Sequence, residues 1–176
     1  MRTLLQIVAV SLVFFCCEGK AVAKNFFTVG AAQFNNIQEA LLFQGADSPY
    51  LGFGIGSLGG VFQSGAISPS TPPTPTATGI TFDGIQGPNP LTGSSLHIIN
   101  TRRGAVFCTW TATFDLDFVE DGKVVFRGDG QFTVVGGTGI YSNASGTFRT
   151  LFQTGEVDAT TDSATAVVFQ YGEINF

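Results

Sequence analysis

The sequence predicts an all-β protein, an antiparallel sandwich or barrel, and three observations lead to that prediction. Short runs rich in Val, Phe and Thr alternate between apolar and polar residues, with turn residues about every 8 to 12 positions. Glycine is frequent, with 23 residues, whereas charged residues make up only 12% of the chain. Long helical patterns are absent, and the one short candidate is NNIQEALLF, where Asn36 can cap a helix.

Residues 1–23 have the pattern of a cleavable secretory signal peptide. Arg2 supplies the positive start, and Leu4–Phe15 is an apolar run shorter than the roughly 20 residues of a membrane-spanning helix. Ala21-Val22-Ala23 then fits the small-x-small rule for cleavage. We therefore expect a secreted, extracellular protein whose mature form is one domain, 24–176, with no membrane span.

Charge and cysteine content exclude several classes of protein. The formal net charge is −5, with 8 basic and 13 acidic residues, so there is no basic surface for nucleic acid or an anionic membrane. Cleavage removes Cys16 and Cys17, and Cys108 is left without an intramolecular partner. Cys108 shares an apolar face with Val106 and Trp110, which favours an inert buried thiol.

The second half of the chain shows the strands most clearly. Ala105 to Val119 alternates with period two, which predicts one long strand or two strands joined by a bend. EDGK, ending at Lys123, predicts a hairpin turn, because Asp-Gly suits a type I′ turn. Further strands are expected at VVFRG, QFTVV, ASGTFRTLFQ and ATAVVFQYGEINF. Closure into a barrel would remove exposed edges from a chain this rich in Phe and Val.

Two glycine-rich or proline-rich stretches interrupt the first half. LGFGIGSLGG, from Leu51, contains a literal dinucleotide-binding pattern, but no helix follows it, so we interpret the match as a coincidence. Residues 68–79, SPSTPPTPTATG, form a loop that must be extended or irregular because proline cannot donate to a strand ladder.

A glycine cluster near the end of the chain, VVGGTGIYSNASG (134–146), lacks the Lys-Ser/Thr ending of a phosphate-binding loop. It is interpreted as a tight connection between two strands. It also resembles the VVGGTG-x-F-x-x-A-x-G signature of plant dirigent proteins, whose barrels are similar to those of allene oxide cyclases. FDGIQGPNPLTG, EDGKVVFRG and DSATAVVFQY extend the resemblance in the same order, so that it covers about residues 80–176.

The resemblance implies an eight-stranded antiparallel β-barrel, commonly a homotrimer, with an apolar cavity and neither cofactor nor metal. Such a protein binds a hydrophobic or phenolic intermediate. It then directs stereoselective coupling of radicals made by a separate oxidase, or acts as a cofactor-free cyclase or isomerase. The alternatives are a barrel that carries a lipophilic ligand without chemistry and a structural or defence protein.

The resemblance also suggests site residues. Asp83, in TFDG, matches the family's acidic position, and Asp129 aligns near a cavity aspartate, although both also suit turns. The family's arginine has no counterpart at Gly130, and Arg127 is the neighbouring cation that could replace it or pair with Asp129. Asp83, Asp129 and Arg127 are therefore the catalytic candidates.

Three further residues are candidates for contact with a substrate: Tyr141, Asp115 and Asp117. Tyr141 either presents its phenol to the cavity or packs at the barrel end. The two aspartates act as a coupled acid pair if their face of the strand points inward, and are solvated if it points outward.

Two further residues, His97 and Asn143, are singled out by their residue type or sequence context. His97 is the single histidine and is predicted to lie on the surface, since no metal-binding or triad partners accompany it. Asn143-Ala144-Ser145 is a sequon for N-glycosylation of Asn143.

Overall fold

The structure, a computed structural model, describes residues 24–35, 37, 50–58, 60–64, 74–87, 97–120 and 122–176. Nearly all of these residues lie in strands, which confirms the all-β prediction. The strands are β1 (Lys24–Asn35), β2 (Tyr50–Gly56), β3 (Gly60–Ser64), β4 (Thr74–Pro75), β5 (Gly79–Gly87), β6 (His97–Thr101), β7 (Gly104–Phe118), β8 (Lys123–Gly137), β9 (Ser145–Thr154), β10 (Val157–Asp158) and β11 (Ser163–Asn175), with a short 3₁₀ helix, η1 (Gly139–Tyr141).

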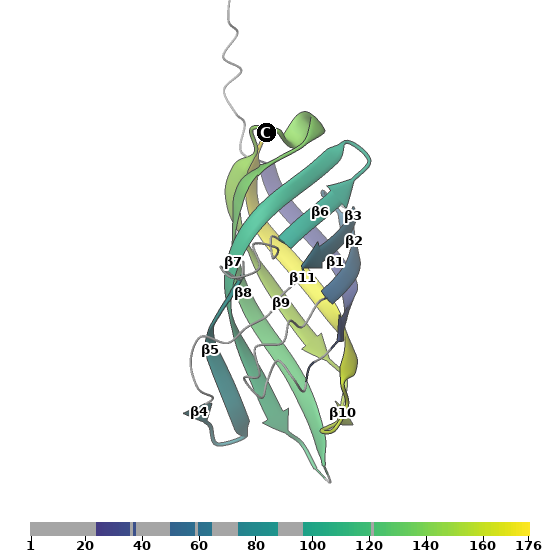
Figure 1. Cartoon of the computed structure of the whole chain (residues 1–176), viewed down its shortest axis with the longest axis vertical. Coiled ribbons are helices and arrows are strands. Elements are labelled where there is room, and N and C mark those ends of the chain that lie inside the picture. The colour runs from purple at the N-terminus through teal and green to yellow at the C-terminus, as the bar shows by residue number, and fades with distance from the viewer. Residues whose placement is uncertain are drawn as a thin grey trace, which may run out of the picture.

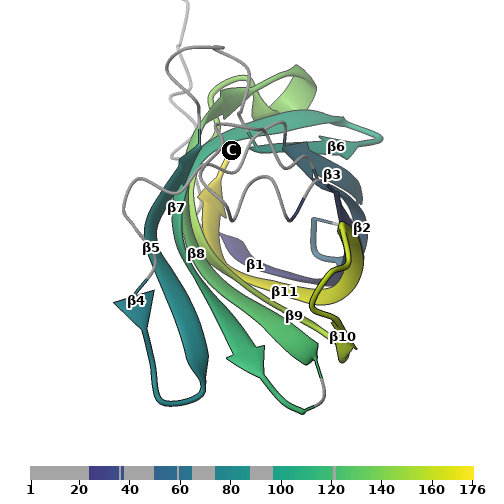
Figure 2. The same ribbon diagram turned by 60° about the horizontal axis from the view of Figure 1, so that its bottom comes forward.

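The strands close into an antiparallel barrel (Figure 1). Eight of the described strands form the ring in the order β8-β9-β11-β1-β2-β3-β6-β7, and the pairing of β7 with β8 closes it. Looking into the barrel, β5 and β4 project beside β7 beyond the ring (Figure 2). The predicted eight-stranded barrel is therefore confirmed.

β7 and β8 form the long hairpin that the sequence predicts, with Gly122 at its turn in the left-handed region (φ 77°). One detail differs from the prediction. VVFRG and QFTVV are not separate strands but parts of β8, which runs without a break through Gly128, Asp129 and Gly130. Asp129 is therefore a mid-strand residue, and the prediction of a turn there was wrong.

Alternation along each strand sends one set of side chains into the barrel and the other outward. Aromatic rings dominate the inner set. Trp110 and Phe132 stack with their centroids 5.6 Å apart, and Phe132 stacks in turn on Phe148 at 4.9 Å. These rings are almost fully buried, so they form the core that holds the wall of the barrel together.

Glycines on the inner face make room for other aromatic rings. A Cβ at Gly128 would collide with the ring of Phe152, and one at Gly52 would collide with the ring of Phe62. The stretch LGFGIG accordingly has Gly52 and Gly54 inside and its large apolar residues outside. The glycines therefore fit neither turns nor a nucleotide loop, because they are the inner half of an alternating pattern.

The glycine cluster connects β8 to β9 through η1, as the sequence predicts. Gly139 lies in the left-handed region (φ 61°), and a Cβ there would collide with the carbonyl oxygen of Arg103. The hydroxyl of Thr138 accepts a hydrogen bond from the backbone N–H of Ala105 at 3.0 Å, which ties the connection to the start of β7.

Several predicted features fall partly or wholly outside the described residues. The signal peptide lies outside them, and β1 begins at Lys24, the residue that follows the predicted cleavage point. Of the helical candidate, residues 35–43, only Asn35 and Ile37 are described: Asn35 is the last residue of β1, and Ile37 is helical. Of the loop at 68–79 the structure describes the part from Thr74, where two residues pair with β5. Among the described residues, no helix is both long enough and apolar enough to cross a membrane.

Candidate functional site

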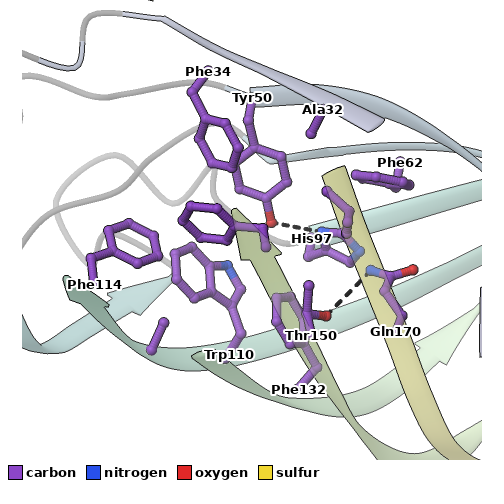
Figure 3. Close-up of a pocket in the computed structure, with 14 residues that line it drawn as sticks. Ala32, Phe34, Tyr50, Phe62, His97, Trp110, Phe114, Phe132, Thr150 and Gln170 are labelled. Carbon is purple, nitrogen blue, oxygen red and sulfur yellow. Dashed lines mark hydrogen bonds between the residues drawn. The ribbon is translucent and has the colours of Figure 1, made fainter. Parts of the chain in front are cut away.

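The barrel encloses a narrow cavity with an aromatic wall. Its volume is about 30 Å³, which is room for about two water molecules. Most of its described lining is apolar, and none of the described lining residues is Asp, Glu, Lys or Arg. The lining residues are Ala32, Phe34, Tyr50, Phe62, His97, Trp110, Ala112, Phe114, Gly130, Phe132, Thr150, Phe152, Val168 and Gln170 (Figure 3).

A tyrosine–histidine pair lies in this apolar surrounding. The phenol oxygen of Tyr50, on β2, is 2.8 Å from Nδ1 of His97, on β6. His97 is 1% exposed and packs edge to face on Phe132, with centroids 4.8 Å apart. Burial lowers the pKa of His97 from 6.5 to about 3, because the imidazolium would lose its hydration there. At neutral pH the imidazole is therefore uncharged and acts through hydrogen bonds.

Two buried nitrogen atoms in the described part of the barrel have no hydrogen-bond partner: Nε1 of Trp110 and Nε2 of His97. Leaving such a group unpaired costs about 1–3 kcal/mol, so native proteins rarely do so. Nearby, the amide of Gln170 donates to the hydroxyl of Thr150 at 3.3 Å. In Figure 3 the indole nitrogen of Trp110 lies on the side of its ring that faces the Tyr50–His97 pair.

The prediction of a surface position for His97 was wrong. The signal that could have placed it inside is the alternation of His97 with Ile99, since residues two apart in a strand share a face and Ile99 is 1% exposed. Tyr50 and Gln170 were also missed, because single polar residues in apolar strands carry no motif.

Four of the predicted charged candidates, Asp115, Asp117, Arg127 and Asp129, lie instead on the outer face of β7 and β8. Arg127 forms an ion pair with Asp117 at 2.9 Å. Asp129 does not pair with Arg127 but with Arg149 of β9, whose Nε donates to Oδ1 at 2.6 Å and whose Nη2 donates to Oδ2. The hydrogen bonds from Arg149 lower the pKa of Asp129 below its ordinary value.

These charged side chains border an open groove on the outside of the barrel. Its volume is about 650 Å³, and Asp115, Arg127 and Asp129 line it together with Val167 and Phe169. The structure therefore brings three of the predicted site residues together, but around a solvent-open groove. Asp115 and Asp117 point outward and are half-buried, and Asp117 pairs with Arg127, so the structure does not form an inward-facing acid pair.

The other predicted site residues lie apart from both places. Asp83 is in β5, where the register with β7 shifts, and its side chain is outside what the structure describes. Tyr141 is buried at the barrel end against Phe176, with centroids 5.0 Å apart, and does not line the cavity. Asn143 is exposed after η1, a position that an oligosaccharide transferase could reach.

The described residues contain neither a reactive thiol nor a group of side chains that could bind a metal ion. Burial raises the pKa of the Cys108 thiol to about 12, which keeps it protonated. No group of three or more His, Cys, Asp or Glu side chains within the described ranges could hold a metal ion.

The interior is thus suited to orienting a guest rather than to proton transfer. An imidazole whose pKa is about 3 is a weak base at neutral pH and carries no proton to donate as a cation. Hydrogen bonds from fixed positions in an aromatic cavity can nevertheless hold a polar atom while the rings hold its apolar body.

Comparisons with known proteins give limited information. No protein-family model matches the chain, and no curated protein matches it either. Among solved structures, the chain is similar to the pterocarpan synthase dirigent protein, with 11% sequence identity, 87% of each chain covered and a TM-score of 0.26. A TM-score this low reflects a poor superposition. The barrel is therefore established by its own strand pairing, and membership of the dirigent family stays a proposal.

Proposed function

We propose that the protein is a secreted, dirigent-like barrel that binds a hydrophobic or phenolic compound in its interior and directs the stereochemistry of its coupling or cyclisation. The observation that carries this proposal is the aromatic-lined cavity that contains the hydrogen-bonded Tyr50–His97 pair. A flat aromatic guest matches such walls, and a few fixed polar atoms suffice to choose one orientation. The neutral imidazole favours a directing role over acid–base catalysis.

Entry of a guest requires side chains to move, since the cavity has room for only about two waters. The rings best placed to move are Phe114 and Phe152, which line the cavity but are only partly buried. They contact each other edge to face with centroids 5.0 Å apart. Rotation of these two rings would widen the cavity at the place where it approaches solvent.

The small cavity also supports a second candidate function, a structural or defence-related barrel whose interior is simply filled. In that case no guest enters, and the interior only holds the strands together. Binding of any neutral aromatic compound inside the barrel would separate the two functions.

A catalytic role for Asp83, Arg127 and Asp129 stays a prediction, and for Arg127 and Asp129 it would use the outer groove. The groove is wide enough for a small molecule and offers charged groups together with the apolar side chains of Val167 and Phe169. Its openness to water argues against control of a reactive intermediate, because bulk water competes there.

We further propose that copies of the chain associate through the outer face of β11, β1, β2 and β3. The family resemblance leads us to expect a trimer. Rows of exposed apolar residues cross these paired strands, among them Val167, Val29, Phe53, Ile55 and Val61. Apolar surface of this kind is typical of protein interfaces. Light scattering on Phe53→Asp should show monomers where the unaltered protein is oligomeric, and an unchanged mass would reject this interface.

The stereo-directing role is tested by coupling a phenol with an oxidase in the presence of the mature protein. The proposal predicts an enantiomeric excess that the oxidase alone does not give. Phe132→Ala, which opens the aromatic wall, should lose that excess if it remains folded, whereas Phe53→Ala on the outer face should keep it. A product ratio equal to that of the oxidase alone would reject the directing role.

A further inference from the structure

The hydrogen-bonding groups inside the barrel restrict the chemistry of the guest, an inference that rests on the proposed interior binding. We propose that the interior selects an uncharged guest whose acceptor oxygen takes the hydrogen bond of Trp110 Nε1–H. Trp110 is the starting point because an indole nitrogen is a donor only. Whatever fills the space beside it must therefore bring an acceptor.

Trp110 is buried and stacked against its neighbours. Its ring is 4% exposed and stacks on Phe132 with 12° between the planes, and it contacts Tyr50 at a centroid distance of 6.4 Å. Stacking fixes the ring plane, and the nitrogen has no hydrogen-bond partner among the described residues. The cavity beside it admits about two waters, which can satisfy the donor in the free protein.

Displacement of that water separates guests by their chemistry. A guest with a carbonyl or hydroxyl oxygen reproduces the lost hydrogen bond, whereas a hydrocarbon leaves the indole N–H buried and unpaired. The neutral form of the guest is favoured because none of the described lining residues carries a charge at neutral pH, His97 included. A carboxylate would lose its hydration without meeting a cation.

The chain offers a site-specific reporter for this test, since Trp110 is its single tryptophan. The indole N–H of the mature protein, labelled with ¹⁵N, gives one resonance that can be followed by NMR. Three probes with one carbon skeleton are titrated: cinnamaldehyde, 1-phenylpropene and cinnamate. We expect cinnamaldehyde to bind and to shift the indole proton downfield, 1-phenylpropene to bind without that shift, and cinnamate to bind at least about 100-fold more weakly than the aldehyde.

Calorimetry on Trp110→Phe supplies the matched comparison. Trp110→Phe removes the N–H and leaves a smaller aromatic ring in its place, so the change that reports the hydrogen bond is a weakening of cinnamaldehyde binding by about 2- to 10-fold relative to 1-phenylpropene binding. If Trp110→Phe changes the binding of both neutral probes equally, and both shift the indole proton to the same extent, the proposed selection for an acceptor oxygen is wrong, although binding in the interior is not. If no neutral probe binds, the proposed function fails together with this inference. If Trp110→Phe does not fold, the comparison of the indole proton shifts caused by cinnamaldehyde and 1-phenylpropene in the unaltered protein tests the proposal by itself.

Discussion

The inner and outer faces of β7 and β8 are formed by alternate residues of the same two strands, and they differ in charge and in contact with water. Outside, Arg127, Asp117, Asp129 and Arg149 are charged, paired and in contact with water. Inside, Trp110 and its neighbours are uncharged and buried, and one donor has no partner. The charges of the outer cluster are therefore already paired, whereas two interior nitrogen atoms, Trp110 Nε1 and His97 Nε2, have no partner among the described residues and are the atoms that a ligand could satisfy.

The largest difference between the two faces should appear when a ring is removed. Phe132→Ala leaves a hole among stacked rings and should lower the free energy of unfolding by about 3–5 kcal/mol. Phe53→Ala removes a ring that is 62% exposed and should change the monomer's stability by less than about 0.5 kcal/mol. Urea denaturation at low protein concentration measures both, and similar losses would mean that the outer ring is buried in the monomer.

A methyl group added to the inner face should have the next largest effect. Gly128→Ala forces the ring of Phe152 to move and should cost about 1–3 kcal/mol. Gly155→Ala is the matched control, because no atom lies within 4 Å of a Cβ built there. If both variants melt at the same temperature as the unaltered protein, Phe152 does not lie against Gly128.

Acid should reveal the buried histidine. The unfolded chain binds a proton at His97 below about pH 6.5, whereas the folded protein does so only near pH 3. The unfolded state therefore binds more protons between these values, and stability falls as the pH is lowered, by at most about 1.4 kcal/mol per pH unit. The outer carboxylate of Asp129 contributes mainly below its ordinary pKa of 3.8, where it would begin to lose its charge.

Denaturation between pH 7 and pH 4.5 isolates the contribution of His97, because that window lies above the titration of Asp129. His97→Gln should remove most of the dependence on pH in this window. A variant with the same pH dependence as the unaltered protein would show that His97 titrates normally and is exposed to water.

The smallest expected effect on guest binding comes from the outer cluster. Asp129→Asn breaks a bidentate pair whose side chains are 39% and 43% exposed, and screening by water and salt makes such pairs weak. Calorimetry should give an affinity for an aromatic guest within about twofold of the unaltered protein. A loss of binding in Asp129→Asn would place the site in the outer groove. A loss of selectivity in both Asp83→Asn and Asp129→Asn would support the predicted catalytic carboxylates.

Much of the fold could be predicted from the sequence, because alternation and turn chemistry are local. The β7–β8 hairpin and the connection at Gly139 are determined by residues adjacent in the chain. Which residues of each strand point into the barrel could not be predicted as well. In RGDGQ and LGFGIG the inner residues are glycines, and the rings that fill the space above them, Phe152 and Phe62, come from other parts of the sequence.

The candidate site was harder to predict for the same reason. Tyr50, His97, Trp110 and Gln170 are distant in sequence and meet only when the barrel closes. No spacing rule connects them, whereas Asp129 and Arg127 are adjacent enough to suggest a motif. Arg149, the actual partner of Asp129, comes from the next strand and could be found only from the register of β8 with β9.

Binding of a guest inside the barrel is tested by intermolecular NOEs, which locate the guest in the mature protein. With cinnamaldehyde bound, we expect NOEs from the guest to ring protons of Trp110 and Phe132 and none to the outer side chains of Val167 and Phe169. NOEs to Val167 and Phe169 alone would place the guest in the outer groove and rule out binding in the interior.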